Sequence, residues 1–241
     1  RGVITGVKQS GVYVGYVAAG AVAPAVAGSF GWRSYFVGVG AVLLLVGVGA
    51  ALTLASDPPR DIPAGEHRPS VPRWVWILSA YGFVMGTASS SATFLPLFAE
   101  SELSFSPVAA GLLTSFLGVA AITTRVAGAR LAERGRRYRT ALTFAAATGV
   151  ACGLVALGSL GAPGLIWGAA VLFALGLSAW NAIGMLAVID LGGPHLAGAA
   201  TGRVLLGFLL GLALGPLAFG ALIEDAGFGA MWVAVSALTG V

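Results

Sequence analysis

Apolar residues run in long uninterrupted blocks along this chain, and charged residues gather in the stretches between them. The uncharged blocks cover residues 9–32, 34–56, 74–99, 103–124, 140–189, 204–223 and 226–241. A helix needs about 20 apolar residues to cross the hydrocarbon core of a membrane. Most of the blocks therefore predict one membrane-spanning helix each.

The block at residues 140–189 is long enough for two helices, and the sequence GSLGAPG at residues 158–164 supplies a turn between them. Strands of a membrane barrel would alternate apolar and polar residues over about ten positions, whereas these blocks are continuously apolar. The pattern therefore predicts eight helices, of which the last is too short to cross comfortably.

Basic residues indicate the orientation. With the N-terminus in the cytoplasm and the helices alternating in direction, 12 of the 13 basic residues fall on or near the inner face, and only Arg33 falls outside. This orientation places residue 1 and the connection at residues 57–73 in the cytoplasm, and we expect a bacterial cytoplasmic (inner) membrane. The net charge of +4 follows from this topology, so no nucleic-acid partner is expected.

Composition supports a membrane protein and offers little chemistry for an enzyme. Hydrophobic residues make up 58% of the chain and charged residues 9%, too few to cover the surface of a soluble domain. Cys152 is the only cysteine, and His67 and His195 lie far apart in polar connections. We therefore expect neither a metal site nor a cofactor, and no enzyme activity.

The two ends of the chain carry the same pattern, displaced by a constant 196 positions. The matched pairs are Thr5/Thr201, Gly6/Gly202, Gly11/Gly207, Gly15/Gly211, Gly31/Gly227, Trp32/Phe228 and Phe36/Trp232. A repeat of this length suits a bundle of six helices, and both copies begin at the inner face, as in transporters built from parallel repeats.

The repeat predicts the domain organisation. Residues 1–56 would close a first half-bundle with two helices, residues 57–73 form a Pro-rich cytoplasmic linker, and residues 74–241 form a second half-bundle of six helices. By this register roughly 120 residues would precede Arg1, and the last helix would be truncated.

Two motifs resemble the major facilitator superfamily. RVAGARLAERGRRYR at residues 125–139 is similar to the inner-loop motif of that family in the second half, with Glu133 in place of the usual Asp, and GLALGPLAFG at residues 211–220 is similar to its G-x-x-x-G-P helix motif. The resemblance implies an all-α, polytopic transmembrane helix bundle with two parallel six-helix repeats. The chain would cover about the fifth to the twelfth helix, with the first half truncated.

Three stripes of side chains are candidates for a substrate cavity. At about 100° per residue, each stripe lies on one face of its helix. The stripes are Gln9, Tyr13 and Tyr16; Tyr81, Met85 and Ser89; and Ser178, Asn181 and Met185, with Trp180 turned about 100° from Asn181. The alternatives are an interfacial aromatic belt for the tyrosines and a hydrogen bond between helices for Asn181.

Glycines spaced by four predict close helix packing. They are Gly11, Gly15, Gly207, Gly211 and Gly215. These glycines either pack helices in general or form a sliding contact between the halves.

An inner gate follows from the resemblance. Glu133 would cap the inner end of the fifth helix, supported by Arg134 and Arg137, with Lys8 and Arg130 nearby. The alternative is a plain basic loop. Arg125 and Arg203 would extend their charged ends to the membrane surface, or else bind an anion.

These observations predict a secondary transporter that moves a small solute by alternating access. Aromatic, Met and hydroxyl stripes favour export of an apolar or amphipathic compound; the alternative is import of a small organic anion, using Arg125, Arg203 or Lys8. No segment carries an Asp or Glu at its midplane, so proton coupling has no evident group here. A non-transporting sensor is the rival from another class. We expect a monomer whose partners are the solute and the bilayer.

Overall fold

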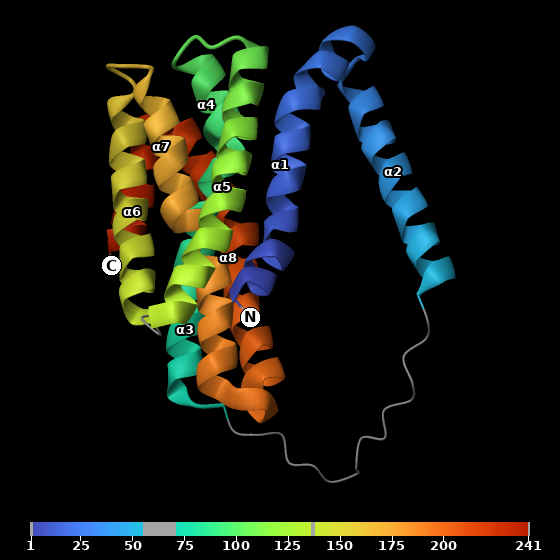
Figure 1. Ribbon diagram of the computed structural model, residues 1–241. Coiled ribbons are helices and arrows are strands. Elements are labelled where there is room, and N and C mark those ends of the chain that lie inside the picture. Colours follow the sequence, from blue (N-terminus) through green and yellow to red (C-terminus); the bar gives the residue numbers. More distant parts are fainter. Residues whose placement is uncertain (1, 55–70, 136–137, 241) are drawn as a thin grey trace.

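The computed structural model describes residues 2–54, 71–135 and 138–240, and this part of the chain contains helices and no strand (Figure 1). In chain order the elements are α1 (Gly2–Phe30), α2 (Trp32–Thr53), α3 (Arg73–Ser89), the 3₁₀ segment η1 (Ser90–Phe94), α4 (Leu95–Ser101), α5 (Pro107–Gly135), α6 (Tyr138–Gly158), α7 (Leu165–Phe173), the π-helical segment η2 (Ala174–Ser178) and α8 (Trp180–Gly240).

Six of the described helical spans are long and apolar enough to cross a membrane: Ser10–Phe30, Trp32–Thr53, Pro107–Gly128, Tyr138–Gly158, Leu165–Gly193 and Leu196–Gly240. The sequence predicted eight. The two counts differ for two reasons. The path from α3 to α4 is divided by η1, and α8 joins two predicted helices across Gly227, whose φ of 79° is not helical. Of the predicted crossings, residues 74–99 are therefore divided by η1, and residues 204–223 and 226–241 both belong to α8.

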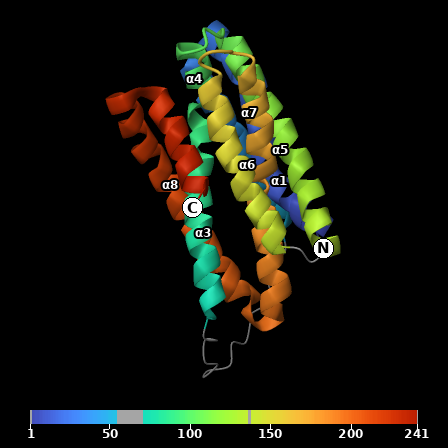
Figure 2. The ribbon, with the colours of Figure 1, turned by 90° about the vertical axis from the view of Figure 1, so that its left-hand side faces the viewer.

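The repeat recurs in the backbone conformation. Gly31, between α1 and α2, has φ 81° and ψ 152°, and Gly227, its partner under the 196-residue displacement, has φ 79° and ψ 173°. A residue with a side chain rarely adopts this conformation, so glycine is required at both turns. The two turns lie at the same end of the bundle (Figures 1 and 2). The equivalent glycines therefore support the doubling that the sequence predicts.

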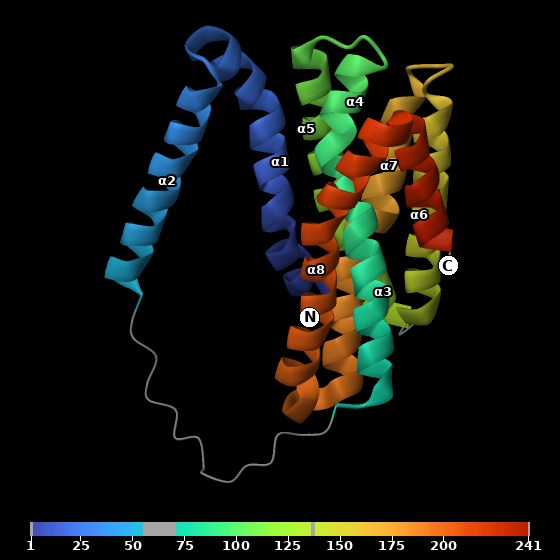
Figure 3. The same cartoon turned by 180° about the vertical axis from the view of Figure 1, so that it is seen from behind.

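The helices after residue 72 form one packed bundle, and α1 lies along α5 at its edge (Figures 1 and 3). The helices α3, α4, α5 and α8 contribute buried residues to one hydrophobic core, among them Met85, Phe98, Leu117, Trp180 and Trp232. The helix α2 stands away from this bundle and has no buried residue. Its exposed Val and Leu side chains suit a membrane environment.

Three of the five glycines expected in helix packing lie against α3. A methyl group added to Gly207, Gly211 or Gly215 would collide with atoms of Ser79, Phe83 or Ser90. The contacts of Gly207 and Gly211 join α8 to α3, and that of Gly215 joins α8 to Ser90 of η1 and to Thr87 of α3. They all lie within the predicted second half and do not support a sliding contact between halves. Absence of a side chain lets the two helix backbones touch.

The packing expected at Gly11 and Gly15 has no partner in the described part of the chain and stays a prediction. Both residues are exposed, and an added methyl group would meet nothing within 4 Å. Instead, α1 approaches α5 through Gly20 and Gly111, each of whose added Cβ atoms would collide with the other's carbonyl oxygen. The closest approach of α1 is therefore two turns further along than predicted, on a different face of the helix.

Candidate substrate cavity

Two of the helical paths through the bundle are interrupted near their middle. The path from α3 to α4 tightens into the 3₁₀ segment η1, and the path from α7 to α8 widens into the π-helical segment η2. Short π-helical segments occur often at functional sites, and interrupted helices form the binding sites of many transporters. The hydroxyl of Ser89, the last residue of α3 before η1, donates a hydrogen bond of 2.9 Å to the Leu177 carbonyl of η2.

Side chains from neighbouring helices satisfy the carbonyls of η2. The Thr124 hydroxyl donates to the Ala174 carbonyl at 2.6 Å, and Arg125 Nε donates to the Ser178 carbonyl at 2.7 Å. In a membrane, carbonyls released from the regular helical pattern need partners within the protein. The three hydrogen bonds to η2 therefore stabilise an interruption that would be costly in lipid.

The helix α1 contributes two tyrosines to the same region. The Arg125 guanidinium carbon lies 4.5 Å from the centre of the Tyr13 ring, and the Tyr13 and Tyr16 rings are 5.2 Å apart. Tyr13 is also within hydrogen-bonding reach of Ser178. Tyr13 is buried, which argues against a role in an interfacial belt. Tyr13, Tyr16 and Ser178 are thus predicted cavity residues that the fold brings together.

One of the two alternatives from the sequence was that Arg125 extends its charged end to the membrane surface. The structure shows that it does not. Its side chain is only 4% exposed and lies between α1, α5 and η2. Arg203 behaves differently, since it is partly exposed, donates to the Ala199 carbonyl on its own helix and lies 5.7 Å from the Trp76 ring. The expectation of a surface-directed side chain is therefore wrong for Arg125 and compatible with Arg203.

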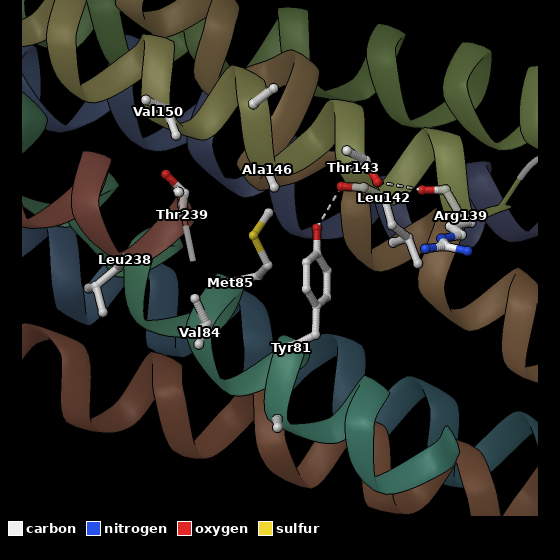
Figure 4. A pocket seen from close by; sticks show the side chains of 13 residues that line it. Tyr81, Val84, Met85, Arg139, Leu142, Thr143, Ala146, Val150, Leu238 and Thr239 are labelled. Atoms are coloured by element: carbon white, nitrogen blue, oxygen red, sulfur yellow. Dashed lines mark hydrogen bonds between the residues drawn. The ribbon is translucent and has the colours of Figure 1, made fainter. Parts of the chain in front are cut away.

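The stripe of Tyr81, Met85 and Ser89 does not reach α1. The Tyr81 hydroxyl donates to the Leu142 carbonyl of α6 at 2.8 Å, and Met85 is fully buried. Both line a cavity of about 740 Å³ between α3, α6 and the end of α8, with Arg139 and Thr239 among the few polar groups around it (Figure 4). Ser89 instead faces η2. The predicted stripe is therefore divided between two places.

Trp180 and Met185 belong to packed regions of the bundle. The Trp180 ring lies 5.7 Å from Tyr81 and 5.2 Å from Phe208, and Met185 packs with Val75 and other apolar residues. Asn181 is 5% exposed, and its Oδ1 atom has no hydrogen-bond partner among the described residues; the same is true of Trp180 Nε1. The hydrogen bond between helices that was one alternative for Asn181 is therefore not seen at its Oδ1 atom among the described residues.

Several predicted residues lie outside the description. The side chains of Gln9, Lys8, Glu133 and Arg134 are not described, nor is Arg137. Arg130 is exposed and lines an apolar hollow on the surface of α5. The inner gate accordingly stays a prediction.

Sequence reasoning missed Thr124 as a polar partner of η2, and it missed the contact at Gly20, Gly111 and Ser115. The Ser115 hydroxyl donates to the Val17 carbonyl at 3.0 Å, beside those glycines. One signal for Arg125 was present in the sequence: it directly follows the uncharged block 103–124 and stands three residues before the end of the apolar span at Gly128. Among the described residues, no group of three His, Cys, Asp or Glu side chains could hold a metal ion.

A membrane-embedded helical bundle with interrupted helices around a polar junction has the construction of a secondary transporter. Comparison with known families gives the same answer, because the model of the Major Facilitator Superfamily matches residues 1–216. The chain belongs to this superfamily, whose members are transporters. No curated protein matches the sequence.

Proposed function

We propose that this chain moves a small solute across the membrane by alternating access, with the solute bound where α1 meets η2 and α5. In this proposal α1 and α2 move with the first half, and the helices from α3 onward form the second half. The two halves rock about the site and expose it to each side of the membrane in turn.

The contact between α1 and α5 is the observation that carries the proposal. The two backbones touch at Gly20 and Gly111, and Gly118 lies against Val17 and the Tyr13 carbonyl. Small residues at a helix crossing leave few interlocked side chains, which suits a contact that must rearrange. The interrupted segment η2 and the buried Arg125 lie beside this contact.

Export of an apolar or amphipathic compound stays a prediction, but its support is reduced. Met85, Trp180 and Met185 are packed among other apolar side chains, and of the three only Met85 lines the cavity between α3, α6 and α8. The alternative, a small organic anion, needs a cation near the junction of the halves, and Arg125 supplies one.

A pair of engineered disulfides tests the proposed motion. Cys152 is first replaced by Ala, since it is the only native cysteine. Val17→Cys with Ser115→Cys joins α1 to α5, where the Ser115 hydroxyl now contacts the Val17 carbonyl. The matched control, Val150→Cys with Ser236→Cys, joins α6 to α8 at the same kind of serine-to-valine contact.

Flux is then measured in proteoliposomes with labelled lactate, succinate, glycerol and ethidium. Oxidation of the α1–α5 pair should stop flux of whichever probe is carried, and reduction should restore it, whereas the α6–α8 pair should have no effect. Flux that continues through the closed α1–α5 disulfide would contradict the proposed motion. Binding of a probe without any flux would favour the sensor.

A further inference from the structure

Arg125 occupies a position that is costly for a cation. It lies on the apolar span Pro107–Gly128, three residues or about 4.5 Å from the end of that span, and is 4% exposed. Charged side chains within membrane spans are expensive, face the bundle interior and mark solute or ion pathways. The position therefore calls for a functional explanation.

The surroundings of the guanidinium come from both sides of the proposed junction. On the side of the second half, Nε donates to the Ser178 carbonyl of η2. On the side of the first half, the Tyr13 ring covers the guanidinium at 4.5 Å, with Tyr16 next to it. A solute held by this group would therefore contact both halves at once, as alternating access requires.

Stabilisation of η2 does not by itself require a charge. The neighbouring carbonyls of Ala174 and Leu177 receive hydrogen bonds from the hydroxyl groups of Thr124 and Ser89. A neutral donor could serve Ser178 equally well, at a lower cost of burial. Nor is a cation needed to hold α1 against α5, because Ser115 and the glycine contact already join them.

We propose that Arg125 binds the carboxylate of the transported solute, which is a small organic anion. The proposal rests on the transport function proposed above and adds to it the class of solute. A guanidinium binds a carboxylate in its own plane through paired N–H groups, whereas an aromatic ring stacks on its face, so both contacts are compatible. Tyr13 orients the guanidinium, and the carboxylate binds at its edge.

Binding measurements on the purified protein test this assignment. The protein is placed in nanodiscs of phosphatidylcholine, so that no anionic lipid competes. The probes are acetate, succinate and benzoate, each paired with its neutral amide. At least one carboxylate should bind while its amide does not. Arg125→Gln and Arg125→Lys should weaken that binding by about 10- to 100-fold, which is the loss expected for hydrogen bonds to a charged group.

Two matched variants separate the site from a general effect of charge or shape. Arg203→Gln removes a cation of a different helix, α8, without touching the site, and the affinity of this variant should equal that of the wild type. Tyr13→Phe keeps the ring over Arg125 and should bind nearly normally, whereas Tyr13→Leu should bind several-fold more weakly. Equal binding to wild type and Arg125→Gln, equal binding of acid and amide, or no carboxylate binding to the wild type would each overturn the assignment.

A measurement on the unmodified protein covers the case in which the Arg125 variants do not fold. Phenylglyoxal modifies arginine, and mass spectrometry reports the extent at each position. Carboxylate should protect Arg125 and leave Arg203 unprotected; no protection, or an Arg125 that never reacts, contradicts the site. If the disulfide experiment shows carried glycerol or ethidium while carboxylates fail here, the anion site is refuted and the transport function stands.

Discussion

Replacing Gly211 by Ala should destabilise the bundle, and the equivalent replacement of Gly15 should not. A Cβ atom at Gly211 would collide with the Phe83 carbonyl and lie 2.8 Å from the Thr87 nitrogen. These are backbone atoms of α3, so neither can turn aside as a flexible side chain could, and the two helices would have to separate. Gly15 holds the equivalent position in the repeat, and an added Cβ atom there meets nothing within 4 Å among the described residues.

The comparison isolates the packing effect. Both variants gain the same helix propensity, up to about 1 kcal/mol for Gly to Ala. Only Gly211→Ala carries the cost of overpacking, which is about 1–3 kcal/mol. The free energy of unfolding of Gly211→Ala should therefore fall below that of Gly15→Ala by about 1–3 kcal/mol.

Unfolding by sodium dodecyl sulfate in mixed micelles, followed by circular dichroism, measures this difference. A difference below about 0.5 kcal/mol, within the usual error of additivity, would refute the close α3–α8 contact. Gly207→Ala provides an independent check, because its added methyl group would collide with Ser79 one turn away.

The remaining predictions concern the interruption and the gate. Ser89→Ala removes the hydrogen bond to the Leu177 carbonyl and should lower the free energy of unfolding by about 0.6–1.7 kcal/mol, measured in the same micelles; Ser101→Ala, whose hydroxyl bonds to its own exposed helix, is the control and should change little. Glu133→Gln keeps the shape of the predicted gate residue but removes its charge, and should weaken the outward-open state. Cysteine accessibility at inner-gate positions should then rise, and unchanged accessibility would contradict the gate.

Most of the fold followed from the sequence because its causes are local. Long apolar blocks predict crossings, and the repeat pairs Gly31 with Gly227, which the structure shows in nearly the same backbone conformation. The positive φ at both positions requires glycine, so the requirement is visible in the residue type itself. The spacing of Gly207 and Gly211 likewise predicted close helix packing, but it did not predict that α3 is the helix they pack against.

The interruptions at η1 and η2 were not predictable from local pattern. The sequence is uncharged through both segments, and η2 is held by hydrogen bonds from Ser89, Thr124 and Arg125, which lie 50 to 88 residues away along the chain. Each interruption also changes the rotation per residue. Tyr81 and Ser89 both lie in the regular helix α3, before η1; eight residues at about 100° each set them about 80° apart, and Tyr81 faces α6 whereas Ser89 faces η2.

The exposed face at Gly11 and Gly15 has a different physical cause. The four-residue spacing of glycines shows that one face of the helix lacks side chains. Whether another helix packs on that face depends on the arrangement of the bundle. In the described chain α5 covers the face with Tyr13, Val17 and Gly20. Polarity was the more useful signal there, since Tyr13 and Tyr16 are replaced by leucines in the second copy of the repeat.

Distance measurements between spin labels test the central claim most directly. With Cys152 replaced by Ala, labels at Ser34, at the start of α2, and Ser101, at the end of α4, would report on the separation of the two proposed halves at one end of the bundle (Figure 1). Labels at Ser101 and Gly161, both exposed and both in the second half, form the control pair. Electron–electron double resonance in lipid should resolve two distances for the first pair and one for the control. A single narrow distance for the first pair, unchanged by added carboxylate, would contradict a carrier whose halves rock about Arg125.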